Sequence, residues 1–137
     1  MAMELLEVGD IMTPKVITAD EDAPITKISK EMELMGVGSV VITKEGKPVG
    51  IVTDRDIALK VTVKDKIPRE IKAKEIMSSP VITIGPDEPQ ERACKLMAER
   101  GIRRLLVMEN DKLVGIISVR NIVTRNPACI KTLYPTE

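Results

Sequence analysis

Two short stretches of this sequence place a hydroxyl side chain three residues before an acid or an amide. GIVTDRDI spans Gly50 to Ile57, and GIISVRNI spans Gly115 to Ile122. Thr53 and Ser118 each end an apolar run that is predicted to be a strand, and a helix is predicted to follow. A strand-to-helix junction offers unpaired backbone N–H groups that attract anions. The pattern therefore predicts two related anion-binding or sugar-binding sites.

The side chains of the first stretch suit a nucleotide. The Thr53 hydroxyl can hydrogen-bond a phosphate or sugar oxygen, and the Asp56 carboxylate can accept from both hydroxyls of a ribose, as acidic residues do in dinucleotide sites. Asn121 stands where the first copy has Asp56, so the second copy has lost this charge.

A purely structural interpretation competes with this one. Thr-x-x-Asp is close to a capping box, in which the hydroxyl caps the helix and the acid reaches back to the N-cap N–H. Arg55 and Arg120 can likewise be solvated charges on a helix surface. Asp20, Glu21 and Asp22 are better explained as an exposed turn than as a metal site, so no metal ligands are predicted.

The two stretches belong to a tandem duplication. The second copy follows the first by 65 positions without a gap, so that IMTPKVIT matches IMSSPVIT and KPVGI matches KLVGI. Each copy predicts a strand (Val16 to Thr18, Val81 to Ile84), a helix and a hairpin of two strands before the second helix. In the first copy Asp22 and Pro24 are predicted to start the helix that Gly36 ends.

Composition limits the function. The 137 residues hold 21 basic and 21 acidic side chains and one aromatic residue, so neither nucleic acid nor an anionic membrane is an expected partner. The chain has no His, which excludes the common nucleophile and zinc arrangements, so we predict no catalytic residues. Cys94 and Cys129 are expected to be reduced thiols, and a cytoplasmic protein is expected because neither a signal peptide nor a membrane span is recognisable.

The order of these motifs resembles the CBS (cystathionine β-synthase) domain, in the tandem arrangement called a Bateman module. The resemblance implies an α+β fold of two β-α-β-β-α units, packed sheet to sheet about a pseudo-twofold axis with two related clefts. The expected domains are residues 8–62 and 73–126, with a charged linker at 63–72 and a polar tail at 127–137. Such pairs commonly hold AMP, ADP, ATP or S-adenosylmethionine as ligands, and no cofactor is required.

The resemblance also implies site residues. One cleft would pair Thr53, Arg55 and Asp56 with residues 77–82 and Ile102, and the other would pair Ser118, Arg120 and Asn121 with residues 12–17 and Val37. Arg103 and Arg104 match a basic pair that often contacts phosphate, whereas the first copy has Gly38 and Ser39 there. The expected adenine-side residues are Lys15, Val16, Ile17, Val37, Gly38, Pro80, Val81, Ile82 and Ile102.

Three classes of function follow. The favoured one is a non-catalytic adenine-nucleotide sensor that regulates a protein which the sequence does not identify. A ligand-free dimerisation scaffold and an enzyme are the alternatives, the enzyme being the weakest. We also predict a homodimer, because apolar helix residues such as Val119, Ile122 and Val123 exceed what one hairpin can cover.

Overall fold

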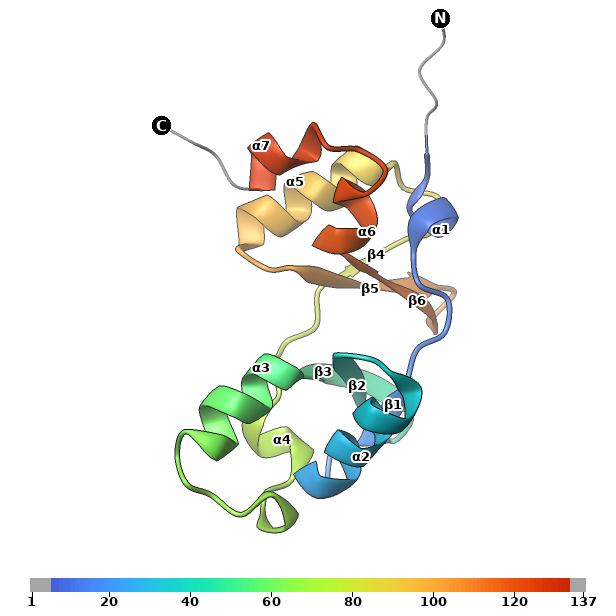
Figure 1. Ribbon diagram of the computed structural model, residues 1–137. Coiled ribbons are helices and arrows are strands. Elements are labelled where there is room, and N and C mark those ends of the chain that lie inside the picture. The colour runs from blue at the N-terminus through green and yellow to red at the C-terminus, as the bar shows by residue number, and fades with distance from the viewer. Residues whose placement is uncertain (1–5, 134–137) are drawn as a thin grey trace, which may run out of the picture. The chain divides into compact units, whose positions relative to one another are not determined.

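The computed structural model of the chain describes residues 6–133 and divides into two compact units (Figure 1). The first-repeat unit runs from Ile17 to Val81. The second-repeat unit combines the chain before Ile17 with the chain from Ile82 onward. A unit is therefore not one uninterrupted repeat, because the segment that precedes each first strand belongs to the other unit.

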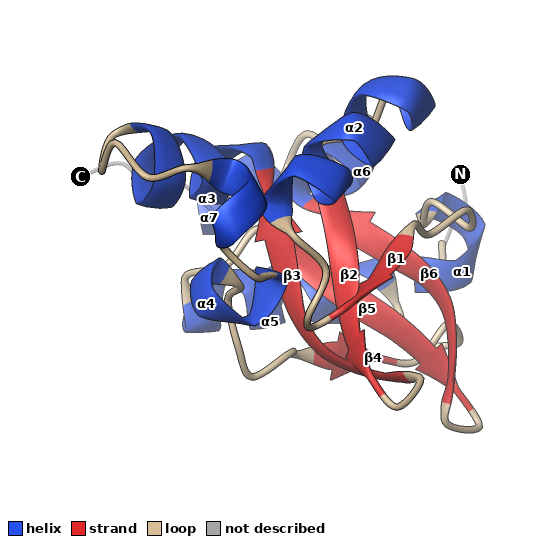
Figure 2. Ribbon diagram, turned by 90° about the horizontal axis from the view of Figure 1, so that it is seen from below, coloured by secondary structure: helices blue, strands red, loops and turns tan. Residues whose placement is uncertain are grey.

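Each unit contains one three-stranded mixed sheet. In the first-repeat unit β1 (Thr18–Asp20) pairs in parallel with β2 (Ser39–Lys44), which pairs antiparallel with β3 (Lys47–Thr53). The same order and directions hold for β4 (Thr83–Ile84), β5 (Arg104–Glu109) and β6 (Lys112–Ser118). The central strand in each case lies between a short edge strand and its hairpin partner (Figure 2). The α+β class, the repeat and both hairpins are thus confirmed, although β1 and β4 begin two residues later than predicted.

One longer helix connects the first and second strands of each sheet. These helices are α2 (Ile25–Met35) and α5 (Gln90–Arg100), and each ends at a glycine with positive φ, 65° at Gly36 and 64° at Gly101. Only glycine takes this conformation without steric cost, which is why the glycine predicted to end each helix is there. Ile25, Ile28 and Met32 are buried, as the helical spacing predicts.

Of the two residues predicted to start α2, Pro24 lies at its start but Asp22 does not cap it. Pro24 occupies the N-cap position, and Asp22 instead forms ion pairs with Lys74 (3.1 Å) and Lys72 (3.6 Å). The hydrogen bond from Lys74 lowers the pKa of the Asp22 carboxyl, and Asp22 in turn raises the pKa of Lys74. This pair stabilises the folded state above the usual Asp pKa, and the contribution is lost as the pH falls through the lowered value. Because both groups are exposed, solvent and salt weaken it.

One short element lies in the stretch predicted to be a linker, residues 63–72, and others flank it. After β3, α3 (Asp54–Ile57) continues into a π-helical turn, η1 (Ala58–Thr62), which buries Val61 in the core. A 3-10 turn, η2 (Pro68–Glu70), and a short helix, α4 (Ala73–Ile76), follow. α4 precedes the strands of the second repeat, and the equivalent helix at the start of the first repeat is α1 (Val8–Ile11). Neither helix was predicted from the sequence.

The short helices that precede the first strand of each repeat, α1 and α4, explain why each unit combines parts of both repeats. α1 belongs to the second-repeat unit, where Val8 N–H donates to the Glu88 carbonyl at 2.8 Å. α4 belongs to the first-repeat unit, where Ala73 N–H donates to the Ala23 carbonyl at 2.9 Å. Beyond each helix a methionine packs against a strand glycine, Met12 against Gly115 and Met77 against Gly50.

Each unit has its own aliphatic core. The first-repeat core is made of side chains from the sheet, α2, η1 and α4. The second-repeat core is made of side chains from the other sheet, α1, α5, α6 (Val119–Val123) and α7 (Cys129–Leu133). The largest fully buried side chains are Ile25, Ile28, Ile42, Met97, Leu105, Leu106, Ile117 and Ile122. Burial of these side chains is the main stabilising contribution in a chain with almost no aromatic residues.

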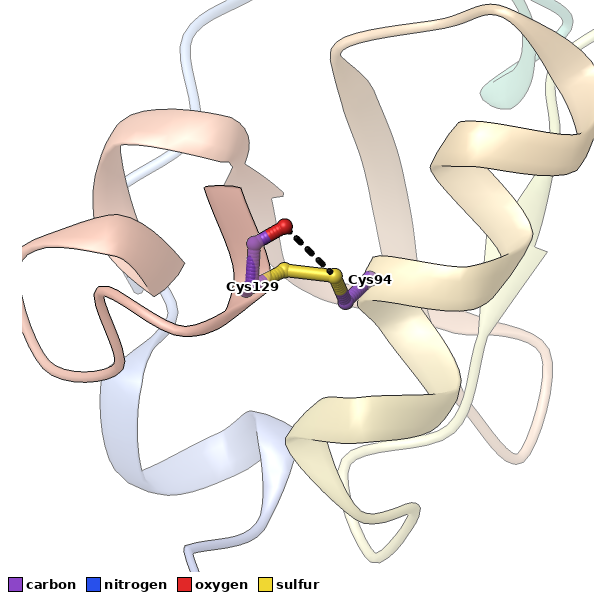
Figure 3. The surroundings of a disulfide bond; sticks show 2 residues. All are labelled: Cys94 and Cys129. Carbon is purple, nitrogen blue, oxygen red and sulfur yellow. Dashed lines mark hydrogen bonds between the residues drawn. A yellow bond between two sulfur atoms is a disulfide. The ribbon is translucent and has the colours of Figure 1, made fainter. Parts of the chain in front are cut away.

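The segment predicted to be a polar tail carries a helix in its described part. After α6 (Val119–Val123), α7 (Cys129–Leu133) lies beside α5 (Figure 1). A disulfide joins Cys94 of α5 to Cys129 of α7, and both residues are buried (Figure 3). The prediction of reduced thiols is therefore wrong, because the packing of α7 on α5 brings together two cysteines 35 positions apart.

The reason given for dimerisation also needs correction. Ile122 is fully buried, Val119 is half-buried against the same core, and Val123 is half-buried. None of the three is therefore an exposed apolar residue. The large apolar side chains that are exposed in the described chain all lie in the first-repeat unit: Leu34, Met35, Leu59, Val63 and Ile67.

Candidate functional site

The Thr53 motif lies at the end of β3, where the chain enters α3. Thr53 N–H and Thr53 Oγ1 both donate to Asp56 Oδ2, at 2.9 and 3.0 Å, and Asp56 N–H donates to Thr53 Oγ1 at 3.1 Å. This is a complete capping box. Asp56 Oδ1 faces Lys60, whose Nζ lies 3.1 Å away, and the Asp56 side chain is only 12% exposed.

The Ser118 motif has the same geometry at the start of α6. Ser118 N–H and Oγ donate to Asn121 Oδ1 at 2.8 and 2.9 Å, and Asn121 N–H donates to Ser118 Oγ at 3.2 Å. The amide nitrogen of Asn121 donates to Thr13 Oγ1 at 3.4 Å. The uncharged amide of Asn121 therefore completes the same capping box at α6 that the carboxylate of Asp56 completes at α3.

Two residues of the preceding strand region lie next to each motif. One is the register partner of the hydroxyl residue, and the other accepts a backbone hydrogen bond from the residue that follows the hydroxyl residue. Ser39 is the register partner of Thr53, and Asp54 N–H donates to the Gly38 carbonyl at 3.0 Å. In the other unit Arg104 is the register partner of Ser118, and Val119 N–H donates to the Arg103 carbonyl at 2.9 Å. The predicted basic pair thus lies in the same unit as Ser118 and beside it.

The leading segments are residues 12–16 and 77–81, which follow α1 and α4. Each one pairs with the strand that ends at a hydroxyl motif. Ile51 of β3 and Ser78 exchange two backbone hydrogen bonds, of 3.1 and 2.9 Å, and Ile116 of β6 and Thr13 do the same at 3.0 and 2.8 Å. The structure therefore brings the Thr53 motif and residues 77–81 into one unit, and the Ser118 motif and residues 12–16 into the other.

The remaining predicted residues divide between the units. Ile17, Val37, Gly38, Pro80 and Val81 share the first-repeat unit with Thr53, Arg55 and Asp56, whereas Lys15, Val16, Ile82 and Ile102 share the second-repeat unit with Ser118, Arg120 and Asn121. Ile17 and Val37 pack against the first-repeat core, and Ile82 and Ile102 pack against the other core. Arg55, Arg103 and Arg120 are exposed.

Two polar residues near the motifs, Lys60 and Asp54, were missed. Lys60 pairs with Asp56 and also donates to the Ile76 carbonyl at 2.8 Å. Its position four residues after Asp56 is the spacing of a helical ion pair, so the sequence did carry a signal. Asp54 lies against Gly38, for which the sequence gives no such signal. The contact of Thr13 with Asn121 falls within the predicted pairing of Asn121 with residues 12–17.

Known proteins identify the repeat. The model of the CBS domain matches residues 8–62 and 73–127. The chain belongs to the CBS domain family. It is a tandem CBS pair, since the two matched regions together span most of its length.

Relatives and solved structures agree with this assignment. An uncharacterized protein of Methanopyrus kandleri is 40% identical over 133 residues, which are 96% of this CBS pair and 68% of that protein. The hexameric CBS-CP12 protein of bloom-forming cyanobacteria has a TM-score of 0.84 at 29% identity, with 99% of this chain and 79% of that chain covered. The CBS domain pair of protein MJ0100, solved with 5′-methylthioadenosine and S-adenosyl-L-methionine, has a TM-score of 0.79 at 29% identity over 91% of this chain and 98% of that one.

Some similar regions are parts of enzymes. Homoserine O-acetyltransferase of Methanococcoides burtonii is 38% identical over 117 residues, but this CBS pair covers only 23% of that enzyme. Among residues 6–133 there is no cluster of His, Cys, Asp or Glu suited to a metal ion, and no helix has the length and apolar character needed to cross a membrane.

Proposed function

We propose that this CBS pair is a non-catalytic sensor of adenosine-containing ligands, with AMP, ADP, ATP and S-adenosylmethionine as the candidates. The observation that carries the proposal is the duplication of one polar arrangement, Thr53 with Asp56 and Ser118 with Asn121, beside equivalent strands and leading segments. A solved CBS pair of the same fold holds two adenosine-containing ligands.

Each residue has a proposed role. The ribose would be contacted by Thr53, Asp56, Ser118 and Asn121. The phosphate would be contacted by Arg55, Arg103, Arg104 and Arg120, because one guanidinium group can donate two parallel hydrogen bonds to phosphate oxygens. The adenine would lie against the aliphatic and backbone groups of Lys15, Val16, Ile17, Val37, Gly38, Pro80, Val81, Ile82 and Ile102. The protein would act in the cytoplasm, as a homodimer, on a regulated protein.

A thermal-shift panel tests the proposal. AMP, ADP, ATP, S-adenosylmethionine and adenosine are each added at increasing concentration, with cytidine monophosphate as the matched control for charge and ribose. A ligand that binds only the folded state stabilises it by about 2.7 kcal/mol at one hundred times its Kd. We expect a concentration-dependent rise in Tm with at least one adenosine ligand, and recovery of that ligand unchanged by chromatography.

The capping boxes favour a second candidate, a ligand-free dimerisation scaffold. Both motifs satisfy their own hydrogen bonds, which is all that a scaffold would require. In that case no adenosine ligand would move the Tm. Product formation from any ligand would instead support an enzyme.

A further inference from the structure

Equivalent positions around the two motifs carry opposite charge. The positions compared are those that the strand register and the helix-start hydrogen bond place next to the hydroxyl residue. In the first-repeat unit they are Gly38, Ser39, Asp54 and Asp56, and in the second-repeat unit they are Arg103, Arg104, Val119 and Asn121. Two carboxylates give the first set a formal charge of −2, and two guanidinium groups give the second set +2. Arg55 and Arg120 are common to both. Lys60, which pairs with Asp56, has Arg125 at its equivalent position, so these cations leave the difference unchanged.

The exposed carboxylate of Asp54 lies beside Gly38. Its Oδ1 accepts from Arg55 N–H at 2.8 Å, and a Cβ built on Gly38 would lie 3.1 Å from its Oδ2. The carboxylate therefore occupies the space above Gly38, at the position where the other repeat has an arginine. A larger residue at Gly38 would have to displace Asp54, so the glycine and the acid form one arrangement.

The charges favour different ligands. A phosphate group next to Asp54 and Asp56 would meet carboxylates of like charge, which disfavours binding. A phosphate group beside Arg103 and Arg104 would meet two cationic hydrogen-bond donors, which favours binding. A sulfonium cation has the reverse preference. A nucleoside without phosphate or sulfonium has no net charge and is tolerated by both.

We propose that the two units select adenosine ligands of opposite charge. The Ser118 motif with Arg103 and Arg104 takes a ligand that carries phosphate, and the Thr53 motif with Asp54 takes a phosphate-free ligand, neutral or sulfonium-bearing. Asp54 and Arg103 are the specificity-determining residues. This inference rests on the proposed function, because it divides the adenosine ligands between the two units.

Simultaneous binding is the first test. Equilibrium dialysis with differently labelled AMP and S-adenosylmethionine measures how much of each is bound, alone and together. We expect about one of each per chain, with neither displacing the other. Displacement of one by the other in equal amounts would overturn the inference, while absence of binding of AMP, ADP, ATP and S-adenosylmethionine, each tested alone, would refute the proposed function itself.

Two variants make the test specific to residues. Asp54→Asn keeps an acceptor for Arg55 N–H and removes the charge, so the first-repeat unit should bind AMP about tenfold more tightly and S-adenosylmethionine more weakly. Asp65→Asn is the matched control, since it removes the same charge at a position of positive φ (54°) that asparagine tolerates. It should change neither affinity.

The reciprocal variant is Arg103→Ala combined with Arg104→Ala. We expect it to weaken AMP and ATP by about tenfold or more and to leave adenosine unchanged. The wild-type affinity for AMP should also fall with added salt, because exposed charges are screened. Equal losses for charged and uncharged ligands would show that the arginines do not select charge, and the inference would be wrong.

Discussion

Asp56 and Asn121 perform the same capping role, but they leave different groups available. The capping box uses both acceptor sites of Asp56 Oδ2, while Oδ1 faces Lys60 and retains acceptor capacity. Asn121 Oδ1 is likewise used twice, and its amide nitrogen can only donate. A helix cap and a ribose contact are therefore compatible at Asp56, and the two repeats are unequal acceptors.

The substitution Asp56→Asn separates these two roles. Asn121 shows that asparagine can close the same capping box, so the Tm of Asp56→Asn without ligand should stay close to that of the wild type. Hydrogen bonds to charged groups contribute about 1.5 to 3 kcal/mol, so the affinity of the first-repeat unit for adenosine should fall about tenfold or more. Calorimetric titration with adenosine measures this.

Asp56→Ala is the comparison variant, because it also removes the cap and should lower stability by about 0.5 to 2 kcal/mol. If Asp56→Asn binds every adenosine ligand as the wild type does, Asp56 is only a capping residue and its proposed contact with the ribose is wrong.

At this scale the sequence identified the residues of the duplicated motif but not their neighbours. A repeated Thr-x-x-Asp pattern is visible in one dimension, and both capping boxes could be predicted from it. The position of Asp54 over Gly38 depends on the hydrogen bond between α3 and the start of β2, which no local pattern encodes.

At the scale of elements, a methionine and a glycine join each leading segment to its sheet. A Cβ added at Gly50 would lie 2.5 Å from Met77 Sδ and 2.7 Å from its Cγ, and one at Gly115 would collide with Met12 and lie 3.0 Å from the Thr13 carbonyl oxygen. Both glycines are buried. The methionine and the glycine are therefore the same in both repeats for a structural reason, since the methionine of each segment packs closely against the strand glycine.

We expect Gly50→Ala to destabilise the protein. The added methyl group must displace Met77, and overpacking of a buried site costs about 1 to 3 kcal/mol. Gly85→Ala is the matched control, because its Cβ would meet only Glu88 Cγ, at 3.8 Å. Urea unfolding of both variants measures the difference. Equal midpoints for Gly50→Ala and Gly85→Ala would show that Met77 moves without cost.

The longer elements were predictable and the shorter ones were not. α2 and α5 have periodic apolar residues and a terminal glycine, and the hairpins have two apolar runs around a polar turn. α1 and α4 have four residues each, too few for a periodic signal. The position of α7 depends on its packing against α5, so the disulfide between Cys94 and Cys129 could not be read from their spacing.

At the scale of the whole molecule, the repeats of the sequence and the units of the structure differ. The matched CBS domains are residues 8–62 and 73–127, whereas the first-repeat unit runs from Ile17 to Val81. α1 and α4 each pack with the sheet of the other repeat. Neither repeat therefore contains all the segments of one unit, and we expect that a fragment with a single repeat would expose the strand that its missing segment covers.

The distribution of exposed apolar side chains predicts which unit forms the proposed homodimer. Leu34 of α2 is 82% exposed and Val63, which follows η1, is 65% exposed. The equivalent positions of the second repeat are Glu99 and Ala128, which are polar or small. Burial of apolar surface is the main driving force of association, so the first-repeat unit should provide the interface. A stable interface of this kind should bury at least about 1,000 Å².

Leu34→Glu tests this, and the residue it introduces is the one that α5 carries at the equivalent exposed position, Glu99. The fold should therefore tolerate it, which circular dichroism can verify, while the charge should disfavour an apolar interface. We expect light scattering at micromolar concentration to give a dimer for the wild type and a monomer for Leu34→Glu. Thr132→Glu adds the same charge to an exposed position of α7 and should remain a dimer. A wild-type monomer would refute the dimer, and a dimeric Leu34→Glu variant would place the interface elsewhere.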